Sequence, residues 1–183
     1  MAYGREPNGI VNRLLKVAPL DLDHFSALRY LHARALRAQT GAVLSEAEIA
    51  AFTRLVHSPA YVDLLLKEEI LGAWLHGELV GSVSWHSSDH AGVARIGSLF
   101  VLHPRMGIGA RLLAIMEARA KECGFAQFAT GVTANAVPFF VRQGYRAASR
   151  GLRMLSADCG LPVTFLKKTL PRHHGHAPPA ALM

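Results

Sequence analysis

One short stretch of the chain restricts its fold more than any other. Residues 99–113, LFVLHPRMGIGARLL, have the apolar side chains of a strand, then a basic turn with two glycines, then the start of a helix. Backbone N–H groups at a helix start have no partner within the helix, and glycine lets a ligand approach them closely. The stretch therefore predicts a strand–turn–helix unit that binds an anion at Gly107 and Gly109.

The rest of the pattern predicts one mixed α/β domain over residues 1–170, because helix-like and strand-like segments alternate along it. We expect helices at 21–41, 45–56, 58–69, 109–123 and 135–144, a β-hairpin at 70–86, and strands at 13–20, 93–101, 126–132, 145–155 and 161–170. In the second arm of the hairpin, a period of two sends Leu79, Gly81, Val83 and Trp85 to one face.

Composition and charge narrow the classes of function. No apolar run approaches the roughly 18 residues of a membrane span, and the first residues lack the pattern of a signal peptide. The two cysteines, Cys123 and Cys159, form neither a disulfide framework nor a metal site. We therefore expect a cytoplasmic protein with no metal and no membrane partner.

The net charge of +7 points to an anionic partner, but the basic residues are scattered along the chain. No recognition helix and no zinc-finger spacing is present, so we expect no nucleic acid. A polyanionic cofactor and a plain excess of surface charge both stay open. The end of the chain, residues 171–183, contains three histidines and two adjacent prolines and predicts a flexible tail.

The glycine turn fits several anions. A dinucleotide-binding turn needs a small residue where Leu112 stands, and the Gly-Lys-Ser/Thr of an NTPase phosphate loop is absent. The pyrophosphate of coenzyme A remains as a ligand. A plain tight turn remains as well, because two glycines alone do not distinguish it from a binding loop.

Three segments and the closing strands carry a resemblance to a known family. The strand ARIGSLFVLHP (94–104), the turn RMGIGARLL (105–113) and the segment NAVPFFVRQGY (135–145) follow one another in the order found in the GCN5-related N-acetyltransferase (GNAT) family. The resemblance covers residues 70–170 and is looser upstream. It implies an α/β fold with a mixed, mostly antiparallel central sheet of six to seven strands, in which two neighbouring strands splay apart around acetyl-CoA.

The resemblance also implies which residues bind the cofactor. The backbone of the strand at Leu99, Phe100 and Val101 pairs with the pantetheine arm of coenzyme A. The amides of the turn hold the pyrophosphate, and Asn135 and Phe140 line the arm. The residues of the turn are Arg105, Met106, Gly107, Ile108, Gly109, Ala110 and Arg111.

The chain departs from the family pattern at three positions. Pro104 stands where the loop commonly has glutamine or arginine, and Arg95 replaces a glutamate that serves as base in some members. Arg95 suits an anionic group of the substrate instead. Phe140 replaces a tyrosine that commonly acts as general acid. The candidates for the missing acid and base are His86, His103 and Tyr145, with Asp89 and His90 as further options for the base.

The implied reaction is direct attack of an amine on the acetyl thioester. We expect an acetyl-CoA-dependent N-acetyltransferase whose acceptor is a primary amine of a small molecule. Two alternatives stay open: a regulatory or interaction module that binds acyl-CoA with little catalysis, and acetylation of a protein amine. Members of the family often dimerise, so a homodimer is expected.

Overall fold

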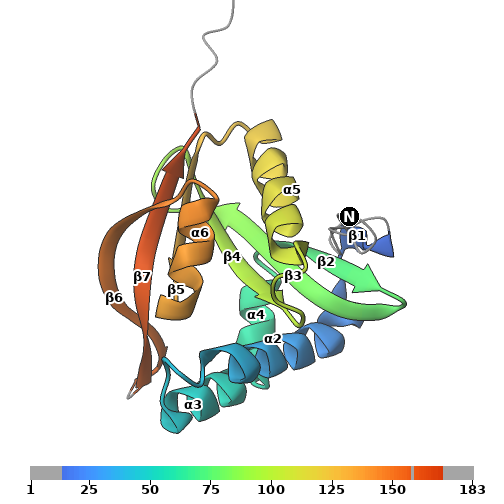
Figure 1. Cartoon of the computed structure of the whole chain (residues 1–183), viewed down its shortest axis with the longest axis vertical. Coiled ribbons are helices and arrows are strands. Elements are labelled where there is room, and N and C mark those ends of the chain that lie inside the picture. Colours follow the sequence, from blue (N-terminus) through green and yellow to red (C-terminus); the bar gives the residue numbers. More distant parts are fainter. Residues whose placement is uncertain (1–13, 158, 171–183) are drawn as a thin grey trace, which may run out of the picture.

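The computed structural model describes residues 14–157 and 159–170 and contains a seven-stranded sheet in the order β1-β2-β3-β4-β5-β7-β6. Every neighbouring pair is antiparallel except β4 and β5, which run parallel. Helices flank the sheet (Figure 1). The predicted mixed, mostly antiparallel fold is therefore confirmed, whereas the predicted tail at 171–183 lies outside the described residues.

The strands are β1 (Lys16–Pro19), β2 (Glu69–Leu75), β3 (Glu78–Ser87), β4 (Val93–Val101), β5 (Gln127–Val132), β6 (Arg146–Ser156) and β7 (Cys159–Thr169). The helices are η1 (Leu22–His24), α2 (Phe25–Thr40), α3 (Glu46–Val56), α4 (Pro59–Leu65), α5 (Ile108–Glu122), η2 (Ala134–Ala136) and α6 (Val137–Arg142). Helix α5 packs on β3 and β4, α2 packs on β3 and β4 as well, and α3 packs on β6 and β7.

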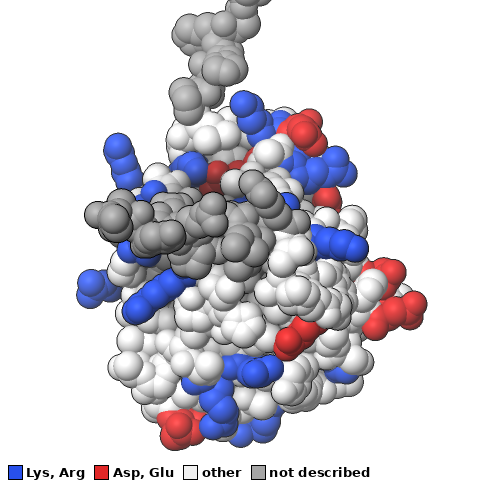
Figure 2. Space-filling model, turned by 45° about the vertical axis from the view of Figure 1, so that its right-hand side comes forward, with Lys and Arg blue, Asp and Glu red and all other residues white. Residues whose placement is uncertain are grey.

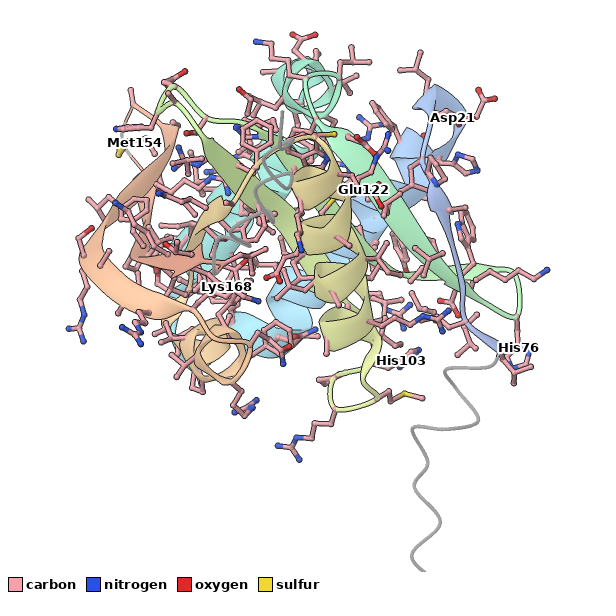
Figure 3. The ribbon with its side chains drawn as sticks, turned by 90° about the horizontal axis from the view of Figure 1, so that it is seen from above. Asp21, His76, His103, Glu122, Met154 and Lys168 are labelled. Carbon is pink, nitrogen blue, oxygen red and sulfur yellow. The ribbon has the colours of Figure 1, made fainter. Side chains whose placement is uncertain are left out.

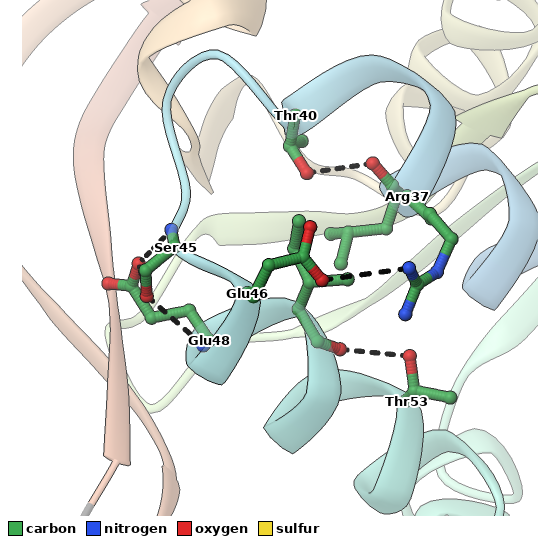
Figure 4. Close-up of polar contacts among 8 residues, drawn as sticks. Arg37, Thr40, Ser45, Glu46, Glu48 and Thr53 are labelled. Atoms are coloured by element: carbon green, nitrogen blue, oxygen red, sulfur yellow. Dashed lines mark hydrogen bonds and ion pairs between the residues drawn. The ribbon is translucent and has the colours of Figure 1, made fainter.

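The junction between α2 and α3 is held by local polar contacts (Figure 4). Ser45 begins α3 with a capping box, in which its hydroxyl accepts the N–H of Glu48 at 3.3 Å and the Glu48 carboxylate accepts the N–H of Ser45 at 2.7 Å. Arg37 of α2 lies 3.7 Å from the carboxylate of Glu46. These contacts fix the turn between a helix that packs on β3 and β4 and a helix that packs on β6 and β7.

Two apolar clusters lie on the two faces of the sheet. Under α5, Leu112, Leu113, Met116 and Ala120 are fully buried, as the helical period predicts. The other cluster joins α2, α3 and α4 to the sheet and contains Leu28, Leu31, Ile49, Phe52 and Leu65. Helices and apolar side chains thus cover much of both faces of the sheet.

The predicted alternation along β3 is wrong at its beginning. Leu79 packs in the cluster of α2, and Val80 packs in the cluster of α5 with Val83 and Trp85. The ladder between β2 and β3 shifts register after Ala73, which inserts one extra residue and reverses the faces before Gly81.

Strands β4 and β5 are paired only over the first third of β4. Their ladder runs from Val93 opposite Gln127 to Arg95 opposite Ala129 and ends there. On the other edge of β4, the register against β3 shifts at Ser98, whose φ of +47° is unusual for serine. The bulge at Ser98 turns the carboxyl half of β4 away from β5, which leaves its backbone on that side without a partner strand among the described residues.

Candidate active site

The turn between β4 and α5 leaves the first N–H groups of a long helix open. Gly107 is the N-cap residue with a φ of +78°, and no side chain caps the helix. A left-handed N-cap explains the glycine, because a side chain is strained there. No acidic residue lies in the first turn of α5, and Arg105 in the turn is exposed. The amide groups and the helix dipole therefore form a site for an anion.

The second glycine lies where α5, α6 and the end of β4 meet. A Cβ on Gly109 would lie 3.5 Å from the ring of Phe139 and 3.7 Å from a methyl group of Val101. Ile108 is 1% exposed, so only its backbone is available to a ligand, and Met106 packs partly against the core. The backbone N–H of Arg111 donates to the carbonyl of Gly107 at 3.0 Å and closes the first helical turn.

The end of β4 makes a contact that the sequence does not indicate. The side-chain amide of Gln39, near the end of α2, donates to the carbonyl of Val101. Asn135 in η2 donates from its side chain to the backbone carbonyl of Gln39 at 3.0 Å. Asn135 does not cap a helix, because Thr133 is the N-cap residue of η2 and Ala136 is the N-cap residue of α6.

Helix α6 places its two phenylalanines differently. Phe140 is 3% exposed and packs edge-on against Phe139 and against Tyr145, at ring distances of 5.1 and 5.2 Å. Phe139 is half-buried and lies beside Gly109. The ring nearest to the glycine turn is therefore Phe139, and the contact of Phe140 with a cofactor stays a prediction.

Tyr145 belongs to a buried polar cluster under α5. Its side chain is 1% exposed, and its hydroxyl faces the carboxylate of Glu117. Glu117 is paired with Lys168 of β7 at 2.6 Å, and Figure 3 shows Lys168 beside α5. Burial, with the charge of Glu117, raises the pKa of Tyr145 well above its usual value. The phenol is therefore locked in the core, and this environment does not support the predicted catalytic role.

On the opposite face of the sheet, polar side chains gather around Gly97 at the bulge of β4. Glu68, in the turn before β2, lies with Oε1 3.4 Å from Nδ1 of His86, and its Oε2 accepts a long hydrogen bond of 3.4 Å from Ser98. A Cβ on Gly97 would lie 3.1 Å from Ser84 Oγ and 3.8 Å from Glu68 Oε1. We call Glu68, Ser84, His86 and Ser98 the Gly97 cluster.

A second buried polar network, which includes His32 of α2, contacts the backbone of the bulge at Ser98. His32 of α2 is fully buried between Tyr61, 2.8 Å from Nδ1, and Ser82, 2.9 Å from Nε2. The hydroxyl of Ser82 donates to the carbonyl of Ser98 at 2.7 Å. Burial, assisted by the charge of Arg153, lowers the pKa of His32 to about 3, so its ring is neutral. Burial likewise raises the pKa of Tyr61.

The other predicted acid and base candidates lie apart from one another. His86 is opposite Arg95 in the ladder between β3 and β4, so both share the face of the Gly97 cluster. His103 is exposed in the loop that precedes α5 (Figure 3). Asp89 and His90 lie in the exposed loop between β3 and β4. The structure therefore brings His86 and Arg95 together at one end of β4 and leaves His103 at the other.

A comparison with known protein families matches residues 41–154 to the acetyltransferase (GNAT) domain. The chain belongs to the GNAT acetyltransferase family. The matched span covers the glycine turn, the bulge and the Gly97 cluster, so the resemblance carried by the turn is confirmed. A search of curated protein sequences finds no match to this chain.

Solved structures of GNAT proteins share this fold. A GCN5-related N-acetyltransferase from Rhodopseudomonas palustris has a TM-score of 0.77 and 22% identity, over 85% of this chain and 95% of the other. The PaiA N-acetyltransferase of Thermoplasma acidophilum, solved with coenzyme A, has a TM-score of 0.64 and 16% identity, over 85% and 98%. The ribosomal-protein-S18-alanine N-acetyltransferase of Escherichia coli has a TM-score of 0.61 and 12% identity, over 89% and 98%.

The surface of this GNAT protein carries both signs of charge. Figure 2 shows lysine and arginine side chains spread over one face, with acidic side chains between them and wide uncharged areas. Within the described residues, no helix combines the length and apolar character that crossing a bilayer requires.

Proposed function

We propose that the protein transfers the acetyl group of acetyl-CoA to a primary amine of a small molecule, by direct attack of the amine on the thioester. The observation that carries the proposal is the open start of α5, which follows β4 at the end where β4 has left β5. That arrangement offers amide donors for the pyrophosphate next to a strand edge for the pantetheine arm.

In this proposal the backbone of Leu99–Val101 pairs with the pantetheine arm, and the amides of residues 106–111 hold the pyrophosphate, with Arg105 adding positive charge. Gln39 takes part because its side chain occupies the Val101 carbonyl. An arm that pairs with β4 competes for that carbonyl, so cofactor binding moves the Gln39 amide to a new partner. Asn135, which holds the backbone of Gln39, then lies beside the arm.

The chemistry makes proton removal more demanding than departure of the thiol. A free alkyl amine has a pKa near 10.4, so roughly one molecule in 10³ is neutral at pH 7. A thiol has a pKa of about 8.5, so the thiolate leaves without much help. The buried position of Tyr145 and the phenylalanine at position 140 are therefore compatible with catalysis, provided that the amine loses its proton.

The acceptor in this proposal carries an anionic group as well as the amine. Arg95 is exposed on the face of the sheet that holds the Gly97 cluster, and it stands opposite His86 in the ladder. When a carboxylate or phosphate of the acceptor binds Arg95, the amine at the other end of the acceptor points toward Ser98 and the thioester.

A second candidate is an acyl-CoA-binding module with little catalysis. The observations that favour it are Arg95 at the position of a family glutamate and Phe140 at the position of a family tyrosine. Acetylation of a protein amine is a further option within the same chemistry, and homodimerisation stays a prediction.

Calorimetry with acetyl-CoA, followed by thiol release with a panel of primary amines, tests the proposal. We expect stoichiometric binding and a release of free CoA that depends on the amine, fastest for amines with an acidic group. Binding without turnover of any amine supports the binding module. Failure to bind acetyl-CoA contradicts both candidates.

A further inference from the structure

We infer that Glu68 is the catalytic base of this protein: its carboxylate takes the proton from the ammonium group of the acceptor at the bulge of β4. The inference rests on the proposed function and assigns its missing step. Glu68 stands in the turn before β2, and sequence patterns gave it no role, because the family base belongs to β4, where this chain has Arg95.

The position of Glu68 supports this role. Its side chain is 15% exposed, so the carboxylate is largely withdrawn from water yet accessible to a ligand. Oε2 accepts from the hydroxyl of Ser98, the residue at which β4 bulges away from β5. The carboxylate therefore contacts the same bulge at which β4 turns its free edge toward the proposed site of the pantetheine arm.

The surroundings of Glu68 contain unused polar atoms. Ser84 Oγ and His86 Nδ1 are buried and, within the described part of the chain, have no hydrogen-bond partner. Buried polar atoms cost free energy when unpaired, so such atoms mark a place where a polar ligand or water fits. Gly97 supplies the room, because a Cβ there would crowd Ser84 Oγ and approach Glu68 Oε1.

These atoms match the needs of an ammonium group. An ammonium has only donors, and Glu68 Oε1 and Ser84 Oγ are acceptors that flank the space beside Gly97. His86 lies 3.4 Å from Glu68, and its ring is partly exposed, so it provides an outlet for the proton toward solvent. The pocket also contains positive charge. Arg95 lies on the same face, and the charge of Arg153 acts on Tyr61, which lies beside Glu68.

The step balances without any further reagent. One proton moves from R–NH3⁺ to the Glu68 carboxylate, and the nitrogen lone pair forms the C–N bond at the thioester carbon. The C–S bond breaks, its electron pair goes to sulfur, and the second proton of the nitrogen ends on the thiolate. Glu68 then returns its proton to solvent through His86, and the products are the N-acetyl amine and CoA.

The test compares Glu68→Gln with Glu69→Gln. Glu69 is a matched control, because it neighbours Glu68 in sequence but pairs with Trp85 and Arg119 instead. With an amine that the unmodified protein acetylates, Glu68→Gln should lower kcat/KM by about 10²-fold or more, and Glu69→Gln should change it by less than about threefold. Both variants should bind acetyl-CoA with unchanged affinity.

A second substrate separates proton removal from positioning. An alkoxyamine analogue, with –O–NH2 in place of –CH2–NH2, is already neutral at pH 7 and needs no base. The defect of Glu68→Gln should shrink at least tenfold on this analogue. An equal defect on both substrates overturns the assignment, since Glu68 then acts by binding or packing alone.

Two further outcomes are decisive. If Glu68→Gln fails to fold, Glu68→Asp takes its place, because it keeps the charge and shortens the reach of the carboxylate. Glu68→Asp should lower kcat/KM on the amine more than on the neutral analogue, and an equal defect on both substrates overturns the assignment. If the unmodified protein binds acetyl-CoA but acetylates no amine, the proposed function falls together with the role of Glu68. Turnover in which Glu68→Gln equals Glu69→Gln overturns the role of Glu68 alone.

Discussion

The ring of Phe139 lies 3.5 Å from the point where a Cβ on Gly109 would stand, so α6 and the start of α5 meet at that glycine. A methyl group of Val101 lies 3.7 Å from the same point. Any longer side chain at Gly109 has to pass between Phe139 and Val101, where the proposed pantetheine arm joins the pyrophosphate site.

Gly109→Glu should therefore abolish binding of acetyl-CoA, because it adds bulk and a negative charge where the pyrophosphate is proposed to bind. Ala118→Glu is the control, since it places the same charge on the exposed side of the same helix. Calorimetry measures the two affinities, and circular dichroism checks the fold. Equal affinities in the two variants would remove the cofactor site from α5.

The pH dependence of kcat/KM should change when His86 is replaced and should persist when His103 is replaced. Activity should rise with pH because the proton of the amine must leave, and His86 lies on the exit from Glu68 whereas His103 is at the far end of β4. The measurement is a pH–rate profile of His86→Asn and His103→Asn beside the unmodified protein. An unaltered profile in both variants would mean that the proton of the amine reaches solvent without passing through either histidine.

Phe140→Tyr should destabilise the protein without increasing the rate. The ring is 3% exposed and enclosed by Phe139 and Tyr145, so the added hydroxyl has no partner and costs about 1–3 kcal/mol. Phe139→Tyr, on the half-buried neighbour, should cost less than half of that. Urea titration gives both free energies of unfolding, and a faster Phe140→Tyr variant would mean that the ring turns toward the thioester.

Replacement of His32 should remove part of the acid sensitivity of the fold. The pKa of His32 is about 3 in the folded protein and about 6.5 in the unfolded chain, so below pH 6.5 the unfolded chain takes up a proton that the folded protein does not. Stability from this residue is complete above pH 6.5 and falls by about 1.4 kcal/mol per pH unit toward pH 3.

The comparison that isolates this effect is the free energy of unfolding of His32→Gln between pH 7 and pH 4.5. The difference between this variant and the unmodified protein should narrow as the pH falls. A constant difference would show that His32 is protonated inside the fold.

Local signals in the sequence predicted the turn and the helices well. Gly107 takes a left-handed backbone in the predicted turn, with α5 beginning at Ile108, one residue before the predicted start, and Ser45 with Glu48 forms the predicted capping box. Both depend on residues within four positions of each other, so spacing alone reveals them. Strands β2, β3 and β4 follow the same logic, because each carries a run of apolar residues of its own.

Contacts between distant parts of the chain were out of reach of such patterns. Gln39 and Val101 are 62 positions apart, and no motif marks either as a partner of the other. Glu68 belongs to a run of charged residues of the kind that is usually exposed on a protein surface. The fold of β3 brings His86 next to it. His32 gave a weak signal, as a histidine among the leucines of the apolar face of α2. The sequence also does not predict which phenylalanine of α6 faces the glycine turn, since rotating the helix by one residue exchanges Phe139 with Phe140.

The identity of the product decides whether the protein is an N-acetyltransferase. The unmodified protein is incubated with acetyl-CoA and an amine that stimulates thiol release, and the amine is recovered and analysed by mass spectrometry and NMR. We expect one acetyl group, attached to nitrogen, in an amount equal to the CoA released. Release of CoA with acetate as the only product, or acetylation at an oxygen, would contradict it.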